Sequence, residues 1–162
     1  MSLRLSILER RILFSVTSIQ SHFDDYAAFH ATSGNKICHR IGIPMIVFSL
    51  LGLLSKIGSP FDPAIILIVI STMYYITLSR VLAILMFLVT LGFWFVAREL
   101  PLIPLWSLFV GGWILQGIGH SVYEKKQPAF VRNLVHLLIG PLWIANDVLP
   151  PGFRVARGVA GS

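Results

Sequence analysis

Residues 63–97 read PAIILIVISTMYYITLSRVLAILMFLVTLGFWFVA and contain a single charged side chain, Arg80. The pair Ser79-Arg80 divides this stretch into two apolar segments. A helix of about 17 residues is about 25 Å long, slightly shorter than a hydrocarbon core of about 30 Å, and flanking residues cover part of the difference. Similar apolar stretches lie on either side. We therefore predict four membrane-spanning helices, at residues 41–54, 63–78, 81–97 and 100–118.

The composition of the 162-residue chain supports a membrane protein. Hydrophobic residues make up 56% and charged residues 12%, whereas an average soluble domain is roughly 25% charged. So few charged side chains are not enough to cover the surface of a water-soluble protein of this size. The one cysteine, Cys38, excludes a disulfide framework and any cysteine-based zinc or iron–sulfur site. The net charge of +6 is scattered between apolar stretches, which favours anionic headgroups over nucleic acid as its partner.

We predict an all-α fold, an integral membrane helical bundle formed by a single domain over residues 1–162. Leu5, Leu8 and Ile12 are spaced for an amphipathic helix over residues 3–19 that lies at the membrane interface. Residues 129–148 form a further apolar helix, interfacial or re-entrant. The predicted segments are interfacial helices at 1–40, four spans at 41–118, a second histidine segment with the C-terminal helix at 119–150, and a flexible tail at 151–162.

The positions of the basic residues predict an orientation. Four crossings place all but two of the 13 Lys and Arg residues on the same side as the N-terminus. The two exceptions are Lys56 and Arg98. The positive-inside rule then puts both termini in the cytoplasm. A bacterial inner membrane and the endoplasmic reticulum both remain open, and so does the oligomeric state.

An even number of crossings also brings distant histidines to one membrane face. His30 and His39 precede the first span, and His120 and His136 follow the fourth. A break at residues 33–35 lets His30 end one short helix and lets His39 lie in the first turn of the next. Asn35 is placed to cap that second helix.

Polar side chains near the fourth span form a stripe. Gln116, His120 and Glu124 follow each other at four-residue spacing, so they share one helix face. Asn133 and His136 are three residues apart and share a face of the next helix. Ionisable residues at a membrane border usually face the bundle or a cavity. We therefore expect the two stripes to converge at a site on the cytoplasmic side.

Histidines in a chain with few thiols suit iron, copper, zinc or nickel. Three or four imidazoles that leave coordination positions open are able to bind dioxygen at Fe(II). Glu124 is either a ligand or, as we favour, a hydrogen-bond partner of the free nitrogen of a liganding histidine. Gln116, Asn133 and Asn35 suit the same supporting role. His22 has no partner spacing and is interpreted as solvated or interfacial.

Two blocks of the sequence resemble the 2-hydroxy fatty acid dioxygenase family, membrane enzymes of fatty-acid α-oxidation. The first block has the pattern Tyr26-x-x-x-His30-x4-Asn35-x-x-x-His39, followed by Gly42-x-Pro44. The second block contains Gly112-Trp113-x-x-Gln116-x-x-Gly119-His120-x-x-x-Glu124-Lys125-x-x-Pro128-Ala129 and continues through Asn133-Leu134 to Pro141. The two blocks cover about a third of the chain, and the apolar layout between them agrees with the family.

This resemblance implies an Fe(II)-dependent enzyme that shortens a long-chain 2-hydroxy fatty acid by one carbon with dioxygen and releases carbon dioxide. The metal role carries over to His30, His39 and His120. His136 departs from the family, which has glutamine there, and is a fourth ligand or an outer hydrogen-bonding group. Tyr26 belongs to the first block and joins the supporting residues named above as a candidate catalytic residue. The acyl tail is expected to lie between the spans, beside membrane lipid.

Two alternatives stay open. A diiron lipid hydroxylase or desaturase needs histidine clusters of the HxxxH and HxxHH types, and this chain has five histidines in all. A non-enzymatic membrane scaffold or transporter subunit requires the histidines to be structural only. Metal stoichiometry and turnover of a 2-hydroxy acid distinguish these hypotheses from the dioxygenase.

Overall fold

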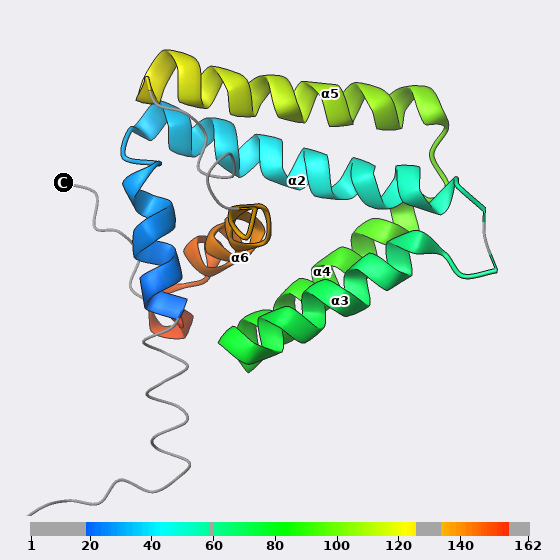
Figure 1. Ribbon diagram of the computed structural model, residues 1–162, viewed down its shortest axis with the longest axis horizontal. Helices are drawn as coiled ribbons and strands as arrows, with labels where there is room; N and C mark the ends of the chain where they lie inside the picture. The colour runs from blue at the N-terminus through cyan, green and yellow to red at the C-terminus, as the bar shows by residue number, and fades with distance from the viewer. Residues whose placement is uncertain (1–18, 59, 126–133, 156–162) are drawn as a thin grey trace, which may run out of the picture.

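The computed structural model describes residues 19–58, 60–125 and 134–155, and all regular structure in them is helical. The all-α prediction is confirmed (Figure 1). Except for Ile19, the amphipathic helix predicted at residues 3–19 lies outside the described residues. The helices are residues 19–28, α2 (Ser33–Ser55), α3 (Pro63–Leu78), α4 (Arg80–Ala97), α5 (Leu102–Ile118), the π-helix η1 (Gly119–Glu124), α6 (His136–Val148) and the 3-10 helix η3 (Pro151–Phe153).

Three helices in the described part of the chain are long and apolar enough to cross a membrane. They are Ser33–Ser55, Arg80–Ala97 and Leu102–Glu124, the last formed by α5 together with η1. The second predicted span, α3, has the predicted bounds, but its 16 residues make it shorter than these three helices. Apolar side chains point outward along these helices, as expected of a lipid-facing surface. Examples are Ile70, Met73, Ile84, Leu88, Phe95, Val110 and Ile114.

A tight connection joins α3 to α4. Ser79 ends α3 and also caps α4, where its Oγ accepts a hydrogen bond from the backbone N–H of Leu82 at 3.4 Å. Asp62 caps the start of α3 and accepts from Ala64 N at 2.8 Å. The two helices therefore run antiparallel, side by side, out and back (Figure 1). The chain thus returns to the end of α2 before α5 begins.

Helices α2 and α5 also lie side by side in opposite directions (Figure 1). Two glycines allow their backbones to approach closely. A Cβ atom built on Gly42 would lie 2.9 Å from the carbonyl oxygen of Gly112, and one built on Gly112 would lie 2.9 Å from the carbonyl oxygen of Gly42. The start of α2 therefore adjoins the end of α5, which brings the two histidine blocks together.

The start of α2 differs from the prediction. The helix begins at Ser33, well before the predicted span at residues 41–54, and Pro44 lies inside it. Thr32 is the N-cap, because its side chain accepts a hydrogen bond from the backbone N–H of Asn35 at 3.4 Å. The prediction that Asn35 caps this helix is therefore wrong. The side chain of Asn35 is buried and belongs to the site described below.

Helix α6 packs in the interior against the helix at residues 19–28 and the α3–α4 pair. The rings of Tyr26 and Trp143 lie 5.5 Å apart, and Tyr75 Oη donates a hydrogen bond to the carbonyl oxygen of Leu138 at 2.8 Å. After α6, Arg154 Nη2 donates to the backbone oxygen of Asp147 at 2.8 Å. The first residues of the predicted tail are thus tied to α6, and residues 156–162 lie outside the described part.

Candidate metal centre

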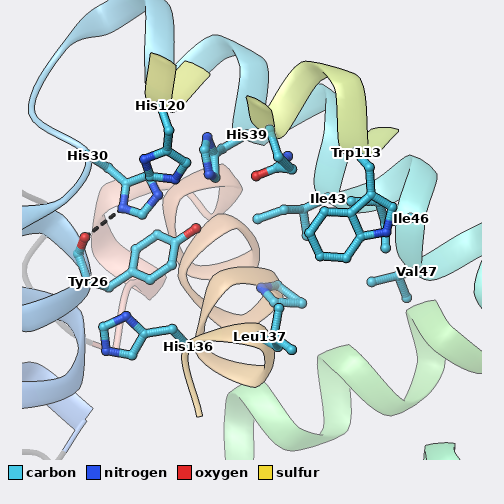
Figure 2. Close-up of a pocket in the computed structure, with 12 residues that line it drawn as sticks. Tyr26, His30, His39, Ile43, Ile46, Val47, Trp113, His120, His136 and Leu137 are labelled. Carbon is cyan, nitrogen blue, oxygen red and sulfur yellow. Dashed lines mark hydrogen bonds between the residues drawn. The ribbon is translucent and has the colours of Figure 1, made fainter. Parts of the chain in front are cut away.

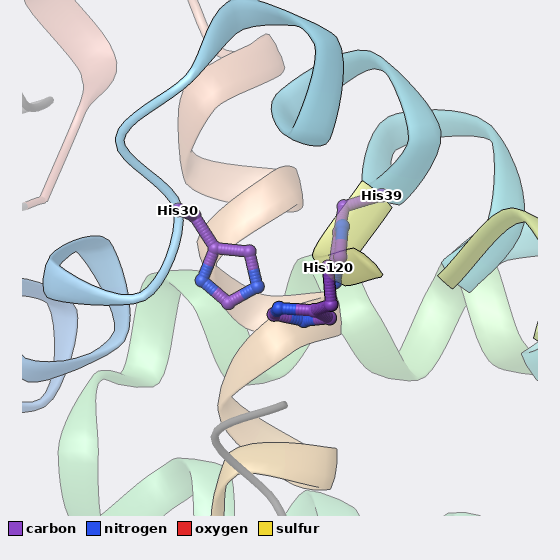
Figure 3. A group of neighbouring side chains, drawn as sticks. All are labelled: His30, His39 and His120. Carbon is purple, nitrogen blue, oxygen red and sulfur yellow. The ribbon is translucent and has the colours of Figure 1, made fainter. Parts of the chain in front are cut away.

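Three buried histidines converge at the junction of α2 and α5 (Figure 3). His30 follows the helix at residues 19–28, His39 lies in the second turn of α2, and His120 lies at the start of η1. Each offers one ring nitrogen, and these atoms lie within 4.8 Å of one another. The exposed fractions of the three side chains are 1%, 3% and 3%. The predicted convergence of His30, His39 and His120 is therefore present.

Backbone carbonyls orient two of the three rings. The Nδ1 atom of His30 lies 2.6 Å from the carbonyl oxygen of Tyr26, and that of His39 lies 3.0 Å from the carbonyl oxygen of Asn35. A carbonyl only accepts hydrogen bonds, so both Nδ1 atoms carry the proton and both Nε2 atoms present a lone pair. His30 Nε2 and His120 Nδ1 are buried without a hydrogen-bond partner.

These unpartnered nitrogens fit a metal. A buried polar atom without a partner is costly, and metal coordination satisfies a lone pair that no donor reaches. Burial, aided by the nearby charge of His39 and opposed by the backbone hydrogen bond, lowers the pKa of His30 to about 3. The neutral imidazole, which is the form that binds metals, therefore prevails at this position. The ring of Tyr26 stacks on that of His30 at 4.0 Å.

Glu124 connects the end of η1 to the loop that carries His30. Its carboxylate accepts hydrogen bonds from Ala31 N at 3.2 Å, Thr32 N at 3.2 Å and Thr32 Oγ1 at 3.0 Å. Asn35 Nδ2 donates to it at 3.1 Å. Sequence reasoning favoured a bond from Glu124 to the free nitrogen of a liganding histidine. In His30 and His39 that nitrogen is hydrogen-bonded to a backbone carbonyl instead. Glu124 holds the loop that carries His30.

A pocket opens beside the three histidines, between α2, α5 and α6 (Figure 2). At one end its wall is made by Tyr26 and the three rings, and at the other end by apolar side chains (Figure 2). It is lined by Tyr26, His30, His39, Ile43, Ile46, Val47, Trp113, Gln116, His120, His136, Leu137 and Pro141. This shape suits a ligand with a polar head and an apolar tail.

His136 lines the same pocket but does not join the three-histidine group found in the described residues. Its ring lies 6.0 Å from that of Tyr26, on the side away from His30 (Figure 2). Its Nε2 atom lies 2.8 Å from Asp25 Oδ2. The structure therefore brings three of the four predicted ligands together and pairs the fourth with a carboxylate. Asn133, predicted to share its face, lies outside the described residues.

Sequence reasoning missed Asp25 and Thr32. Asp25 has no helical spacing to another site residue that would single it out, because its partner His136 is far along the chain. Thr32 directly precedes the predicted break at residues 33–35, and its position before Ser33 is typical of an N-cap.

These features define a candidate membrane metalloprotein with a three-histidine site and an apolar pocket. A family model described as 2-hydroxy-palmitic acid dioxygenase Mpo1-like matches residues 16–150, and the chain belongs to this family. The 2-hydroxy-palmitic acid dioxygenase MPO1 of Saccharomyces cerevisiae is 29% identical over 138 residues, which cover 81% of this chain and 79% of the yeast protein. No solved structure matches the chain. The resemblance inferred from the two sequence blocks is thereby confirmed.

Proposed function

We propose that this chain is an Fe(II)-dependent dioxygenase that converts a long-chain 2-hydroxy fatty acid to the fatty acid one carbon shorter, with release of carbon dioxide. The observation that carries the proposal is the buried group of three imidazoles that opens on a pocket with an apolar end. The family's description, which names a 2-hydroxy acid and a dioxygenase, supports the substrate class and the reaction.

His30, His39 and His120 would hold the metal through one nitrogen each. Three imidazole ligands leave coordination positions open for other molecules, and they suit Fe(II) among the transition metals. Bound Fe(II) would supply the binding and activation of dioxygen. Glu124 and Asn35 hold the loop and helix that present His30 and His39, so both act by positioning the ligands.

The apolar part of the pocket would bind the acyl chain. Ile43, Ile46 and Val47 on α2 face Trp113 of α5 and Leu137 of α6 across it. Each methylene buried there contributes about 0.8 kcal/mol, so affinity should rise with chain length until the pocket is filled. Tyr26 forms part of the polar end, where its ring stacks on that of His30.

We also propose that both termini and the metal centre face the cytoplasm. The excess of Lys and Arg near the termini supports this orientation, which requires the shorter apolar helix α3 to cross the membrane together with the three candidate spans. Reporter domains fused to each end, one active only in the cytoplasm and the other only outside it, test it. Activity of the external reporter at either end would contradict the orientation.

The function is tested with the purified chain in detergent. Elemental analysis should give one iron atom per chain after iron loading. With 2-hydroxypalmitate and oxygen, mass spectrometry should show pentadecanoate and carbon dioxide. Two metal ions per chain would instead favour a diiron enzyme. A chain that binds no transition metal tightly and converts no 2-hydroxy acid would favour the scaffold.

A further inference from the structure

The hydroxyl group of Tyr26 lies where the polar end of the pocket meets its apolar wall (Figure 2). The tyrosine ring stacks on that of His30 at 4.0 Å, with an angle of 13° between the planes. The tip of the ring lies beside α6, because a Cβ atom built on Gly140 would lie 3.0 Å from Tyr26 Oη. The same Cβ atom would lie 3.0 Å from the Cδ1 atom of Ile43, the aliphatic side chain that follows His39 along the pocket wall of α2. The hydroxyl group is therefore flanked by an imidazole of the metal centre and by the start of the apolar wall.

This hydroxyl group is available to a ligand. The hydrogen bond between Tyr26 and His30 uses the backbone oxygen of Tyr26, and no other described residue forms a hydrogen bond with its hydroxyl group. Two nitrogen atoms of the same wall differ from it, since Gln116 Nε2 and His136 Nδ1 are sealed from the pocket and have no partner. Gln116 Nε2 therefore does not support a histidine, contrary to the expectation from the sequence. The Tyr26 oxygen is not among these sealed atoms and points into the pocket (Figure 2).

We propose that Tyr26 Oη forms a hydrogen bond with the 2-hydroxyl group of the bound acid and thereby selects 2-hydroxy acids over fatty acids that lack this group. A carboxylate placed at the three imidazoles puts the next carbon atom of the acid, C2, one bond further along the pocket. The 2-hydroxyl group then lies at the boundary marked by Tyr26 Oη, and the chain beyond it lies against aliphatic side chains such as Ile43. A hydroxyl group both donates and accepts, so the two groups form a hydrogen bond in either direction. This inference rests on the proposed function for the class of ligand.

The test compares two ligands of equal chain length, 2-hydroxypalmitate and palmitate, which lacks the 2-hydroxyl group. Their affinities are measured for the metal-free chain with chelator present, and again for the iron-loaded chain without oxygen, so that no turnover occurs. Tyr26→Phe keeps the ring that stacks on His30 and removes only the hydroxyl group. Tyr75→Phe is the matched control, because Tyr75 is a buried tyrosine outside the pocket whose Oη donates to the carbonyl oxygen of Leu138 at 2.8 Å.

We expect the unchanged chain to bind 2-hydroxypalmitate more tightly than palmitate, and Tyr26→Phe to reduce this preference about five- to tenfold under both conditions. Tyr75→Phe should keep the preference. Equal weakening of both acids would mean that Tyr26 only shapes the pocket, and an unchanged preference would mean that its hydroxyl group makes no such bond. A reduction seen only with iron would mean that Tyr26 acts through His30. Each of these three results overturns the inference.

Thermal unfolding without ligand provides a second measurement. The Tyr26 hydroxyl group has no partner among the described residues, so Tyr26→Phe should melt no lower than the unchanged chain. Tyr75→Phe removes a hydrogen bond within the protein and should melt lower. A clear loss of stability in Tyr26→Phe would show that its hydroxyl group supports the fold rather than a ligand, and would overturn the inference.

Turnover separates this inference from the proposed function. Suppose that the unchanged chain, loaded with iron and given oxygen, converts no 2-hydroxypalmitate but still prefers it to palmitate through Tyr26. The proposed reaction then fails and the subsite for the 2-hydroxyl group stands. If the chain converts the acid while Tyr26→Phe keeps the preference, the reaction stands and the subsite fails.

Discussion

Replacement of Glu124 by Gln should weaken metal binding although Glu124 is not in the three-histidine group. The carboxylate accepts hydrogen bonds from Ala31 N, Thr32 N, Thr32 Oγ1 and Asn35 Nδ2. Glutamine puts an NH₂ group where one carboxylate oxygen was, so at least one of these donors faces another donor. Hydrogen bonds to charged groups contribute about 1.5–3 kcal/mol each, and an unsatisfied buried group costs about 1–3 kcal/mol.

The lost hydrogen bonds should weaken metal binding, because Ala31 directly follows His30, one of the three histidines of the site. We expect Glu124→Gln to lower the free energy of unfolding by about 2–4 kcal/mol and iron affinity by about 10- to 100-fold. Thermal unfolding in detergent and iron competition with a chelator measure the two effects. Glu99→Gln is the matched control, because Glu99 is exposed and pairs with Arg98 away from the site. Unchanged stability and iron affinity in Glu124→Gln would refute the positioning role that we assign to this carboxylate.

Three further predictions concern the ligands, pH and helix packing. Alanine at any histidine of the three-histidine group should abolish iron binding and turnover, whereas His22→Ala should keep both; elemental analysis and product assays check this. Because the pKa of His30 falls from 6.5 to about 3 in the fold, the unfolded chain binds the proton first as pH drops. The metal-free protein should therefore lose stability as pH falls from 6.5 toward 3, and His30→Gln should flatten that loss in unfolding curves. Gly42→Ala places a Cβ 2.9 Å from the Gly112 carbonyl oxygen and should destabilise the chain by about 1–3 kcal/mol. Gly92→Ala is the matched control, because a Cβ at that position has nothing within 4 Å and should not destabilise the chain. Equal melting temperatures of the two variants would contradict this.

The arrangement of the histidines was predictable because it follows from topology. The apolar runs are interrupted by short polar breaks, and the break at Ser79 is visible in the sequence as a turn between two such runs. The helical hairpin formed by α3 and α4 lies between α2 and α5 in the chain and returns it to the end of α2, so α5 runs back along α2. This consequence does not depend on whether α3 crosses the membrane fully.

The start of α2 was harder to predict. Lys36, His39 and Arg40 interrupt the apolar pattern, so the first turns of the helix look like part of a polar segment. The cap at Thr32 and the long-range bond from Asn35 to Glu124 stabilise these turns instead. A contact between residues 89 positions apart leaves no periodicity in the sequence.

The contacts of Glu124 could not be predicted from the sequence either. The stripe Gln116-His120-Glu124 assumes α-helical spacing, whereas residues 119–124 form a π-helix. A π-helix has a wider turn and often marks a functional site. His120 turns toward the other two histidines here, and Glu124 turns toward the loop after His30. No local feature of the sequence distinguishes this turn from an ordinary α-helical one.

The most direct test of the metal centre is X-ray absorption at the iron edge of the iron-loaded, purified chain. We expect one iron atom per chain, with scattering from three imidazole rings in its coordination sphere. An iron atom without imidazole scattering, or two iron atoms at short distance from each other, would contradict it.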